Sequence, residues 1–159
     1  MSNETSTARD VTAAIDRWEI AEVCVRMAWH ADQREWDKLT RVFADKVELD
    51  YTSLNGGEPV TLTPDQIATG WSSVLGTFDA TQHLTGNHLV TLDGDQAVCT
   101  ASFQATHRLH STVGSGLWTL GGTYHFDLIR TDAGWRISRV VMKATWGDGN
   151  QELLTRASQ

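Results

Sequence analysis

Long apolar runs, prolines and cysteines are all scarce in this sequence. Its 159 residues include two prolines, both in the first half, and two cysteines. No apolar run approaches the roughly 20 residues that cross a bilayer, and residues 1–9 lack the apolar core of a secretory signal. No repeat, low-complexity tract or proline-rich linker divides the chain. These absences predict a cytoplasmic protein and argue against a transmembrane one.

Positive charge is scarce as well. Thirteen Lys and Arg residues against 20 Asp and Glu residues give a net charge of −7. No stretch gathers enough Lys or Arg to make a phosphate-binding surface. We therefore expect neither nucleic acid nor an anionic membrane as a partner.

The motifs of the common cofactor and metal sites are absent. The sequence has no P-loop, GxGxxG, GxSxG, HExxH or EF-hand loop. His107 and His110 have a spacing that could suggest metal ligands, but in a strand their side chains point to opposite faces. We therefore expect no metal ion and no cofactor.

What is present is ordinary for one globular domain. Hydrophobic residues make up 40% of the chain and charged residues 21%, and the length is typical of a single domain with its own core. We expect one domain over 1–159, with its folded core at about 10–148. Cys24 and Cys99 lie in apolar patterns without CxxC spacing, so we interpret both as reduced core residues, with a buried disulfide as the alternative.

Three segments have the apolar periodicity or the terminal signals of a helix. The first, residues 10–29, has apolar side chains at spacings of three and four that we expect to face the core: Ala14, Trp18, Ala21, Val25 and Ala28. The second begins after residue 31 and ends near residue 45. The third covers about 64–75, with Pro64 at its first position and Thr63 as its N-cap.

The rest of the chain alternates with period two. Apolar side chains occupy every second position in three segments: residues 47–51, 97–109 and 118–128. Hairpin turns are predicted at 93–95 and 131–134, and Gly121-Gly122 predicts a bulge or sharp bend. Helices followed by long strands and short turns predict an α+β fold. In this fold a curved antiparallel sheet packs on N-terminal helices and encloses a small apolar pocket.

Strand alternation sorts the candidate histidines. His107 lies on a face that otherwise carries only apolar side chains, so it is either a core histidine bonded to a backbone carbonyl or a pocket residue. His110 and His125 lie on polar faces and are expected to be solvated. In simple alternation His83 shares a face with Asn87, but the pattern does not decide whether that face is internal.

One carboxylate and two phenols complete the candidates. Asp32 follows the first helix, and with Glu35 three residues later it forms a capping-box pattern, although a carboxylate at a helix junction can also face inward. Tyr51 and Tyr124 lie on the apolar sides of their strands. Each is either a core residue with a satisfied hydroxyl or a hydrogen-bond donor to a substrate carbonyl.

Several motifs resemble one known family in order along the chain. The run from Ala31 to Leu39, followed by Val47 to Tyr51, resembles the scytalone dehydratase and SnoaL-like branch of the nuclear-transport-factor-2-like superfamily. Thr81-Gln82-His83 with Gly86, and Thr106-His107-Arg108, resemble its two histidine strands. The hairpin from Asp132 to Ile137 resembles one seen across the superfamily. The similarity covers residues from about 13 to 148.

The resemblance implies a cone-shaped fold with a pocket at one end. It also implies roles for four residues: Asp32 orients His83, His107 faces the substrate, and Tyr51 polarises a substrate carbonyl. The chain departs from the family pattern in three respects. A second pocket tyrosine of the family falls on Ala31, an asparagine falls on Tyr124, and the family's long C-terminal segment is reduced to the tail after Trp146.

These residues favour a cofactor-free lyase that removes a proton α to a carbonyl and eliminates water from a small hydrophobic, polyketide or aromatic substrate. An isomerase or polyketide cyclase could use the same Asp–His pair, and the fold also serves as a non-catalytic binding module or a structural subunit. We expect four residues to contact the substrate: Tyr124, Trp29, Phe103 and Asn87. We also expect a homo-oligomer, dimer or trimer, that buries the outer face of the sheet, with Trp118 among the large residues near strand ends.

Overall fold

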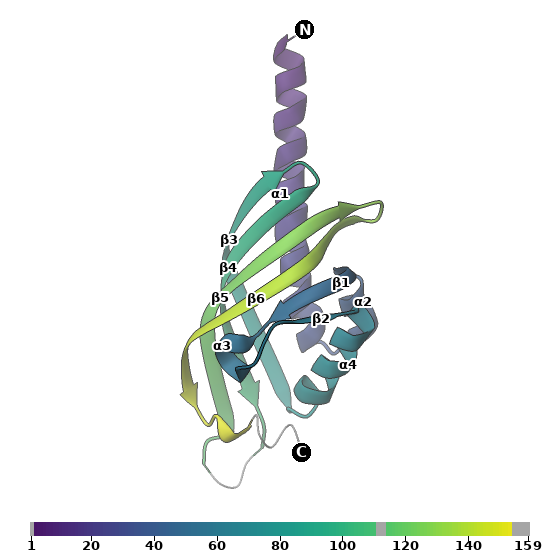
Figure 1. Ribbon diagram of the computed structural model, residues 1–159. Coiled ribbons are helices and arrows are strands. Elements are labelled where there is room, and N and C mark those ends of the chain that lie inside the picture. Colours follow the sequence, from purple (N-terminus) through teal and green to yellow (C-terminus); the bar gives the residue numbers. More distant parts are fainter. Residues whose placement is uncertain (1, 111–113, 154–159) are drawn as a thin grey trace.

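The computed structural model describes residues 2–110 and 114–153, with side chains described from Arg9 onward (Figure 1). The helices are α1 (Ser2–Asp32), α2 (Trp36–Thr40), α3 (Thr52–Asn55) and α4 (Pro64–Leu75). The strands are β1 (Phe43–Asp50), β2 (Val60–Leu62), β3 (Ala80–Asp93), β4 (Gln96–Arg108), β5 (Leu117–Thr131) and β6 (Gly134–Gly149). The predicted α+β class is confirmed.

The six strands form one curved sheet in the order β2-β1-β6-β5-β4-β3, which wraps around the C-terminal half of α1 (Figure 1). Consecutive long strands are antiparallel hairpins, and the register shifts between Gly121 and Gly122, as the glycine pair predicts. One pairing differs from the all-antiparallel expectation, because β1 runs parallel to β6. Alternation along a strand predicts which face a residue takes, but it does not reveal which distant strand lies beside it.

Helix α1 is longer than predicted and turns a different face to the sheet. Its buried side chains lie toward one side: Asp16, Ile20, Cys24, Met27, Ala28 and Ala31. Of these, Ala28 was predicted to face the core and does so. Of the predicted face, Trp18 is 65% exposed and Val25 42% exposed. The expected face was wrong because α1 carries two apolar stripes and the sheet covers only one of them.

The second predicted helix is much shorter in the structure. It ends at Thr40, since Val42 and Phe43 are buried at the start of β1 rather than on a helix face. The third predicted helix is confirmed as α4, where Thr63 and Gln66 form a reciprocal capping box ahead of Pro64.

A β-bulge in β3 separates the face of His83 from that of Asn87, and the structure shows which face is internal. The pairing with β4 shifts register between Gly86 and Leu89, and Asn87 has a positive φ of 56°. Before the bulge the less exposed positions include His83 and Thr85, and after it they include His88 and Val90. The bulge therefore separates His83 from Asn87, which points outward.

The core contains both cysteines. Cys24 and Cys99 are free thiols with no exposed surface, in agreement with the predicted reduced core residues. Within the part of the chain that the structure describes, no helix is long and apolar enough to cross a membrane.

Candidate active site

A cavity of about 530 Å³ lies between the concave face of the sheet and the helices. Its wall is mainly apolar and aromatic, with large side chains from α1, α4, β4 and β5: Met27, Trp71, Phe103, Trp118 and Leu120. Four polar side chains that sequence analysis predicted also line it: Tyr51, His83, His107 and Tyr124. This combination of an apolar wall and a few convergent polar groups is typical of a small-molecule site.

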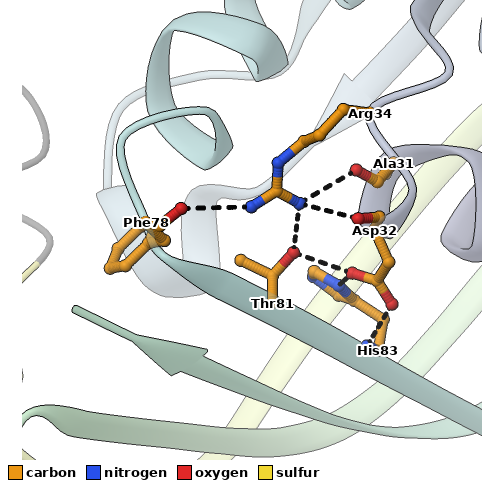
Figure 2. Close-up of polar contacts among 6 residues, drawn as sticks. All are labelled: Ala31, Asp32, Arg34, Phe78, Thr81 and His83. Carbon is orange, nitrogen blue, oxygen red and sulfur yellow. Dashed lines mark hydrogen bonds and ion pairs between the residues drawn. The ribbon is translucent and has the colours of Figure 1, made fainter.

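Asp32, the last residue of α1, is hydrogen-bonded to β3. Its Oδ1 lies 2.7 Å from His83 Nδ1 and accepts from the Thr81 hydroxyl at 2.9 Å, and its Oδ2 accepts from the His83 backbone N–H at 2.6 Å (Figure 2). The carboxylate therefore holds both the backbone and the ring of His83. The capping-box alternative is wrong, because α2 starts after Glu35 without a side-chain cap.

The surroundings of Asp32 keep its carboxylate ionised. Burial alone would raise the pKa of the Asp32 carboxyl, but the hydrogen bonds and charge of His83, together with the Thr81 hydroxyl, hold it below its ordinary value. An ionised Asp32 accepts a hydrogen bond from the Nδ1–H of His83. In neutral His83 the lone pair is therefore on Nε2. His83 lines the cavity, and this lone pair suits a general base there.

His107 is buried beside His83 among aromatic rings. It is 4% exposed, and its ring centroid lies 5.0 Å from Phe78, 5.0 Å from Trp118 and 5.5 Å from His83. Burial, followed by the neighbouring His83, lowers the pKa of His107 to about 4. His107 is therefore neutral at pH 7. Its Nδ1 makes no hydrogen bond to any described residue, so this buried nitrogen is free to bond a ligand.

The two tyrosines lie together in the same cavity. Tyr124 packs against Phe103 with ring centroids 4.5 Å apart, and Tyr51 meets Trp71 edge-on at 6.3 Å. Burial raises the pKa of Tyr51 well above its ordinary value, and it raises the pKa of Tyr124 to about 12 against a lowering effect of Tyr51. Both phenols keep their hydrogens at neutral pH and can donate to a ligand oxygen.

Two predicted substrate-binding residues lie elsewhere. Trp29 is 58% exposed because it lies on the face of α1 that the sheet does not cover. Asn87 points outward because of the bulge, and its side-chain amide donates to Ser102 Oγ at 3.4 Å. Neither lines the cavity. The remaining predicted contacts, Phe103 and Tyr124, do.

The histidines that were expected to be solvated lie away from the cavity. His125 pairs with Asp127 at 3.0 Å and its side chain is 42% exposed, while His110 is exposed after the end of β4. His125 therefore points outward from β5, as alternation predicts, and His110 is solvated as expected. In residues 2–110 and 114–153 no group of three His, Cys, Asp or Glu side chains could hold a metal ion.

Sequence analysis missed three residues of the site. Trp118 was expected near a strand end, but its ring lies in the cavity wall against His107. Thr81 and Arg34 belong to the hydrogen-bond network of Asp32 (Figure 2). Thr81 could have been found, since it lies two residues before His83 and shares its face. Arg34 follows the helix in a loop and has no periodic signal.

Comparisons with known proteins agree with this architecture. The family model of the SnoaL-like domain matches residues 12–141. Protein Rv2910c of Mycobacterium tuberculosis is 35% identical over 130 residues, which cover 79% of this chain and 83% of that protein. The crystal structure of the Kfla4162 protein from Kribbella flavida is 33% identical, with a TM-score of 0.86 over 90% of this chain and 99% of that one.

Two more distant structures share the fold. A scytalone dehydratase-like protein from Novosphingobium aromaticivorans has 18% identity and a TM-score of 0.74, with 91% of this chain and 92% of that one covered. The hexachlorocyclohexane dehydrochlorinase LinA-type3 from Novosphingobium barchaimii has 14% identity and the same TM-score, with 89% and 94% covered. The likeness to a SnoaL-like domain supports a small-molecule-processing enzyme or a binding module, and the two more distant structures show that the fold is shared.

Proposed function

Because this chain belongs to the family of SnoaL-like domains, we propose that it is a lyase of the dehydratase type. It removes a proton α to a carbonyl of a small, hydrophobic, polyketide or aromatic substrate and expels a β-leaving group. The observation that carries this proposal is the Asp32–His83 pair, whose imidazole lines an apolar cavity beside His107.

The two histidines and two tyrosines of the cavity each have a role in the proposed reaction. His83 Nε2 takes the α-proton, and Asp32 stabilises the imidazolium that forms. The C–H electrons move onto the carbonyl, where Tyr51 and Tyr124 donate to the developing enolate oxygen. As the enolate collapses, the new C=C bond forms and the bond to the leaving hydroxyl breaks. The hydroxyl takes a proton and leaves as water.

The proton for the leaving group comes from His83 in this scheme. His107 has a pKa of about 4, so few molecules carry an imidazolium there at neutral pH. We assign His107 a hydrogen bond that holds the leaving group, and the proton that His83 removed from carbon is the one delivered. The elimination then returns His83 to its starting state without an outside acid.

Two structural neighbours support elimination. By their names, a dehydratase removes water and a dehydrochlorinase removes hydrogen chloride, and both reactions make a double bond by losing a proton and a leaving group. At 18% and 14% identity they supply an analogy of fold. The support for elimination itself comes from the polar groups in the cavity.

A second candidate is an isomerase or cyclase. The neutral His107 fits it as well as it fits elimination, since a histidine that is not an acid can hold a substrate oxygen while His83 returns its proton to another carbon. The products separate the two candidates. Elimination lowers the mass of the substrate by one water or one leaving group, and isomerisation leaves the mass unchanged.

The experiment is a screen of small, uncharged β-hydroxy carbonyl compounds, followed by the absorbance of the conjugated product and by mass. With an active compound, His83→Ala should lower kcat by about 10²–10⁴-fold, as loss of a general base does, while His125→Ala, on the outer face, is the matched control. Equal turnover by His83→Ala and the parent protein would reject the acid–base mechanism. Ligand binding without turnover would assign the cavity to a binding module.

We also propose a cytoplasmic homo-oligomer, a dimer or a trimer. The support comes from α1 rather than from the outer sheet face, which is largely polar on β4. Large apolar side chains that are 42–65% exposed lie on one side of α1: Val11, Ile15, Trp18, Val25 and Trp29. Light scattering at micromolar concentration tests this, and a stable monomer would contradict it.

A further inference from the structure

Arg34 occupies a position that its backbone conformation alone would not favour. It follows α1 with a φ of 59°, in the left-handed region where glycine or asparagine is usual after a helix. An L-residue with a side chain is less favourable there than glycine. The contacts of the side chain offset this cost.

The guanidinium of Arg34 makes four hydrogen bonds and none of them goes to a carboxylate. Nη1 donates to the main-chain carbonyls of Ala31 at 3.3 Å and Asp32 at 2.9 Å, and to Thr81 Oγ1 at 2.7 Å (Figure 2). Nη2 donates to the Phe78 carbonyl at 3.4 Å. The side chain therefore joins the carbonyl end of α1 to Phe78, just before β3, and to Thr81, within β3. It leaves the Asp32 carboxylate free to bond His83.

The bond to Thr81 gives the network a direction. A guanidinium can only donate, so Thr81 Oγ1 must accept from Arg34. The single hydroxyl hydrogen of Thr81 is then available for Asp32 Oδ1, which lies 2.9 Å away. Arg34 thus orders a chain of donors in which Thr81 donates to Asp32, and Asp32 receives the Nδ1 hydrogen of His83.

The bond to Phe78 reaches the second histidine. Phe78 is buried, and its ring packs on His107 with centroids 5.0 Å apart. The carbonyl that Arg34 binds belongs to this same residue. Burial and then His83 lower the pKa of His107 most, and the positive charge of Arg34 adds a smaller lowering effect, against the raising effects of a backbone hydrogen bond at Trp118 and of Asp32.

We propose that Arg34 is a positioning residue that fixes both cavity histidines: His83 through Thr81 and Asp32, and His107 through Phe78. The proposal rests on the proposed function, since it concerns the same site. Arg34 does not line the cavity, so it acts through these residues and does not touch the substrate. The sequence run that carries Asp32 therefore also carries the side chain that orients it.

The test uses two pairs of variants and one control. Arg34→Lys keeps the charge but cannot make the four bonds, whereas Arg34→Met loses both. Thr81→Val removes the hydroxyl at nearly constant shape, and Thr81→Ser keeps it. Arg26→Met is the control, because Arg26 is an exposed residue of α1 that pairs with Glu22 on the same helix.

The first readout needs no substrate. ¹⁵N NMR of the imidazoles should show His83 as the Nδ1–H tautomer in the parent, Thr81→Ser and Arg26→Met proteins. Arg34→Lys and Thr81→Val should instead show a mixture of tautomers at equal folded fraction by circular dichroism. In Arg34→Met, His107 should titrate above its parent pKa of about 4. A role in folding alone would lower stability and leave the tautomer of the folded molecules unchanged.

The second readout is turnover of an active substrate. We expect kcat to fall by about 10- to 100-fold in Arg34→Lys and Thr81→Val, with KM little changed, because a displaced base reacts slowly without weakening apolar binding. Unchanged tautomer and kcat in both variants would overturn the proposal. If Arg34→Met does not fold, the Thr81 pair still decides it. If His83→Ala keeps full turnover while the tautomer depends on Arg34, the proposed function fails and the positioning role stands.

Discussion

Helix α1 carries two inward carboxylates, Asp16 and Asp32, and the two ends of the molecule use them differently. Asp16 receives two hydrogen bonds from Arg130, at 2.9 and 2.7 Å, and one from Trp135 Nε1 at 3.0 Å. Arg130 also lies 4.4 Å from the centre of the Trp135 ring. Asp32 is bonded instead to Thr81 and to His83.

The difference lies in the partner. The hydrogen bond from Arg130, despite partial burial, lowers the pKa of Asp16, and His83 with Thr81 does the same for Asp32, so both carboxylates are ionised. A guanidinium does not release its proton at any pH that proteins tolerate, whereas an imidazole exchanges one near neutrality. Asp16 with Arg130 therefore fastens the helix to the β5–β6 hairpin, while Asp32 with His83 can take part in proton transfer.

The largest expected effect is that of Asp32→Asn on turnover. The imidazole remains but loses its orienting charge, so kcat should fall by about 10–10³-fold, less than for His83→Ala. Steady-state kinetics on the same substrate measures this. If only Asp32 takes part in turnover, Asp16→Asn should keep its kcat when assayed as folded protein. An equal loss of kcat in both variants would contradict the different roles of the two carboxylates.

Acid unfolding should sharpen the comparison through His107. Its pKa is 6.5 in the unfolded chain and about 4 in the folded one, so the unfolded state binds more protons between these values and stability falls as the pH falls through this window. The loss is about 3 kcal/mol, at about 1.4 kcal/mol per unit. Urea unfolding at pH 7, 5 and 4 measures it, and His107→Gln should flatten this part of the curve.

The carboxylates contribute to a different part of the pH profile. Asp16 and Asp32 have lowered pKa values in the folded state, so their contribution is complete above the ordinary Asp pKa and disappears as the pH falls through the folded value. Their loss should therefore appear mainly below about pH 4. A His107→Gln protein that still loses stability between pH 6.5 and 4 would assign that slope to other groups.

Asp16→Ala should destabilise the fold by about 2 kcal/mol, because it leaves Arg130 and the Trp135 N–H without their buried acceptor. The free energy of unfolding in urea at pH 7 measures this. Turnover per folded molecule should not change. A stability loss no larger than that of Asp32→Ala would show that the two ends of α1 are not specialised in the way the contacts indicate.

The smallest effect is expected at a carboxylate–histidine pair on the outer face of the sheet. Asp127 and His125 lie 3.0 Å apart, but their side chains are 37% and 42% exposed on the outer face. His125→Ala should change the free energy of unfolding by less than about 0.5 kcal/mol and leave kcat unaltered. A large effect on stability or kcat would mean that pairing with a carboxylate is enough to make a histidine important, even outside the cavity.

Features encoded locally could be predicted from the sequence. Thr63 and Pro64 mark a helix start through a cap and a fixed φ, and the regular strand β4 places His107 on the buried face by parity. The family resemblance predicted that Asp32 contacts His83, although the two lie in distant segments. No local pattern predicts such a contact. Their contact then follows from the curvature of the sheet around α1.

Features that depend on distant packing could not be predicted. The bulge near Asn87 changes the parity of β3, and its local signal is the single glycine Gly86, so Asn87 was expected to contact the substrate although it points outward. Trp18 and Trp29 recur at helical spacing on α1, and periodicity cannot decide which of two apolar stripes a sheet will cover. Arg34 was missed because its importance lies in hydrogen bonds to residues more than 40 positions away.

Two tryptophans in the cavity wall have an optical consequence. Trp71 and Trp118 line the cavity, while Trp18, Trp29 and Trp146 are exposed. A ligand that enters the cavity changes the surroundings of the first two indoles and does not contact the other three. The emission spectrum of the native protein therefore carries an intrinsic signal of occupancy, and acrylamide, which quenches exposed indoles first, enriches it. The affinity of a ligand for the cavity can therefore be measured by tryptophan fluorescence, without any turnover of the ligand.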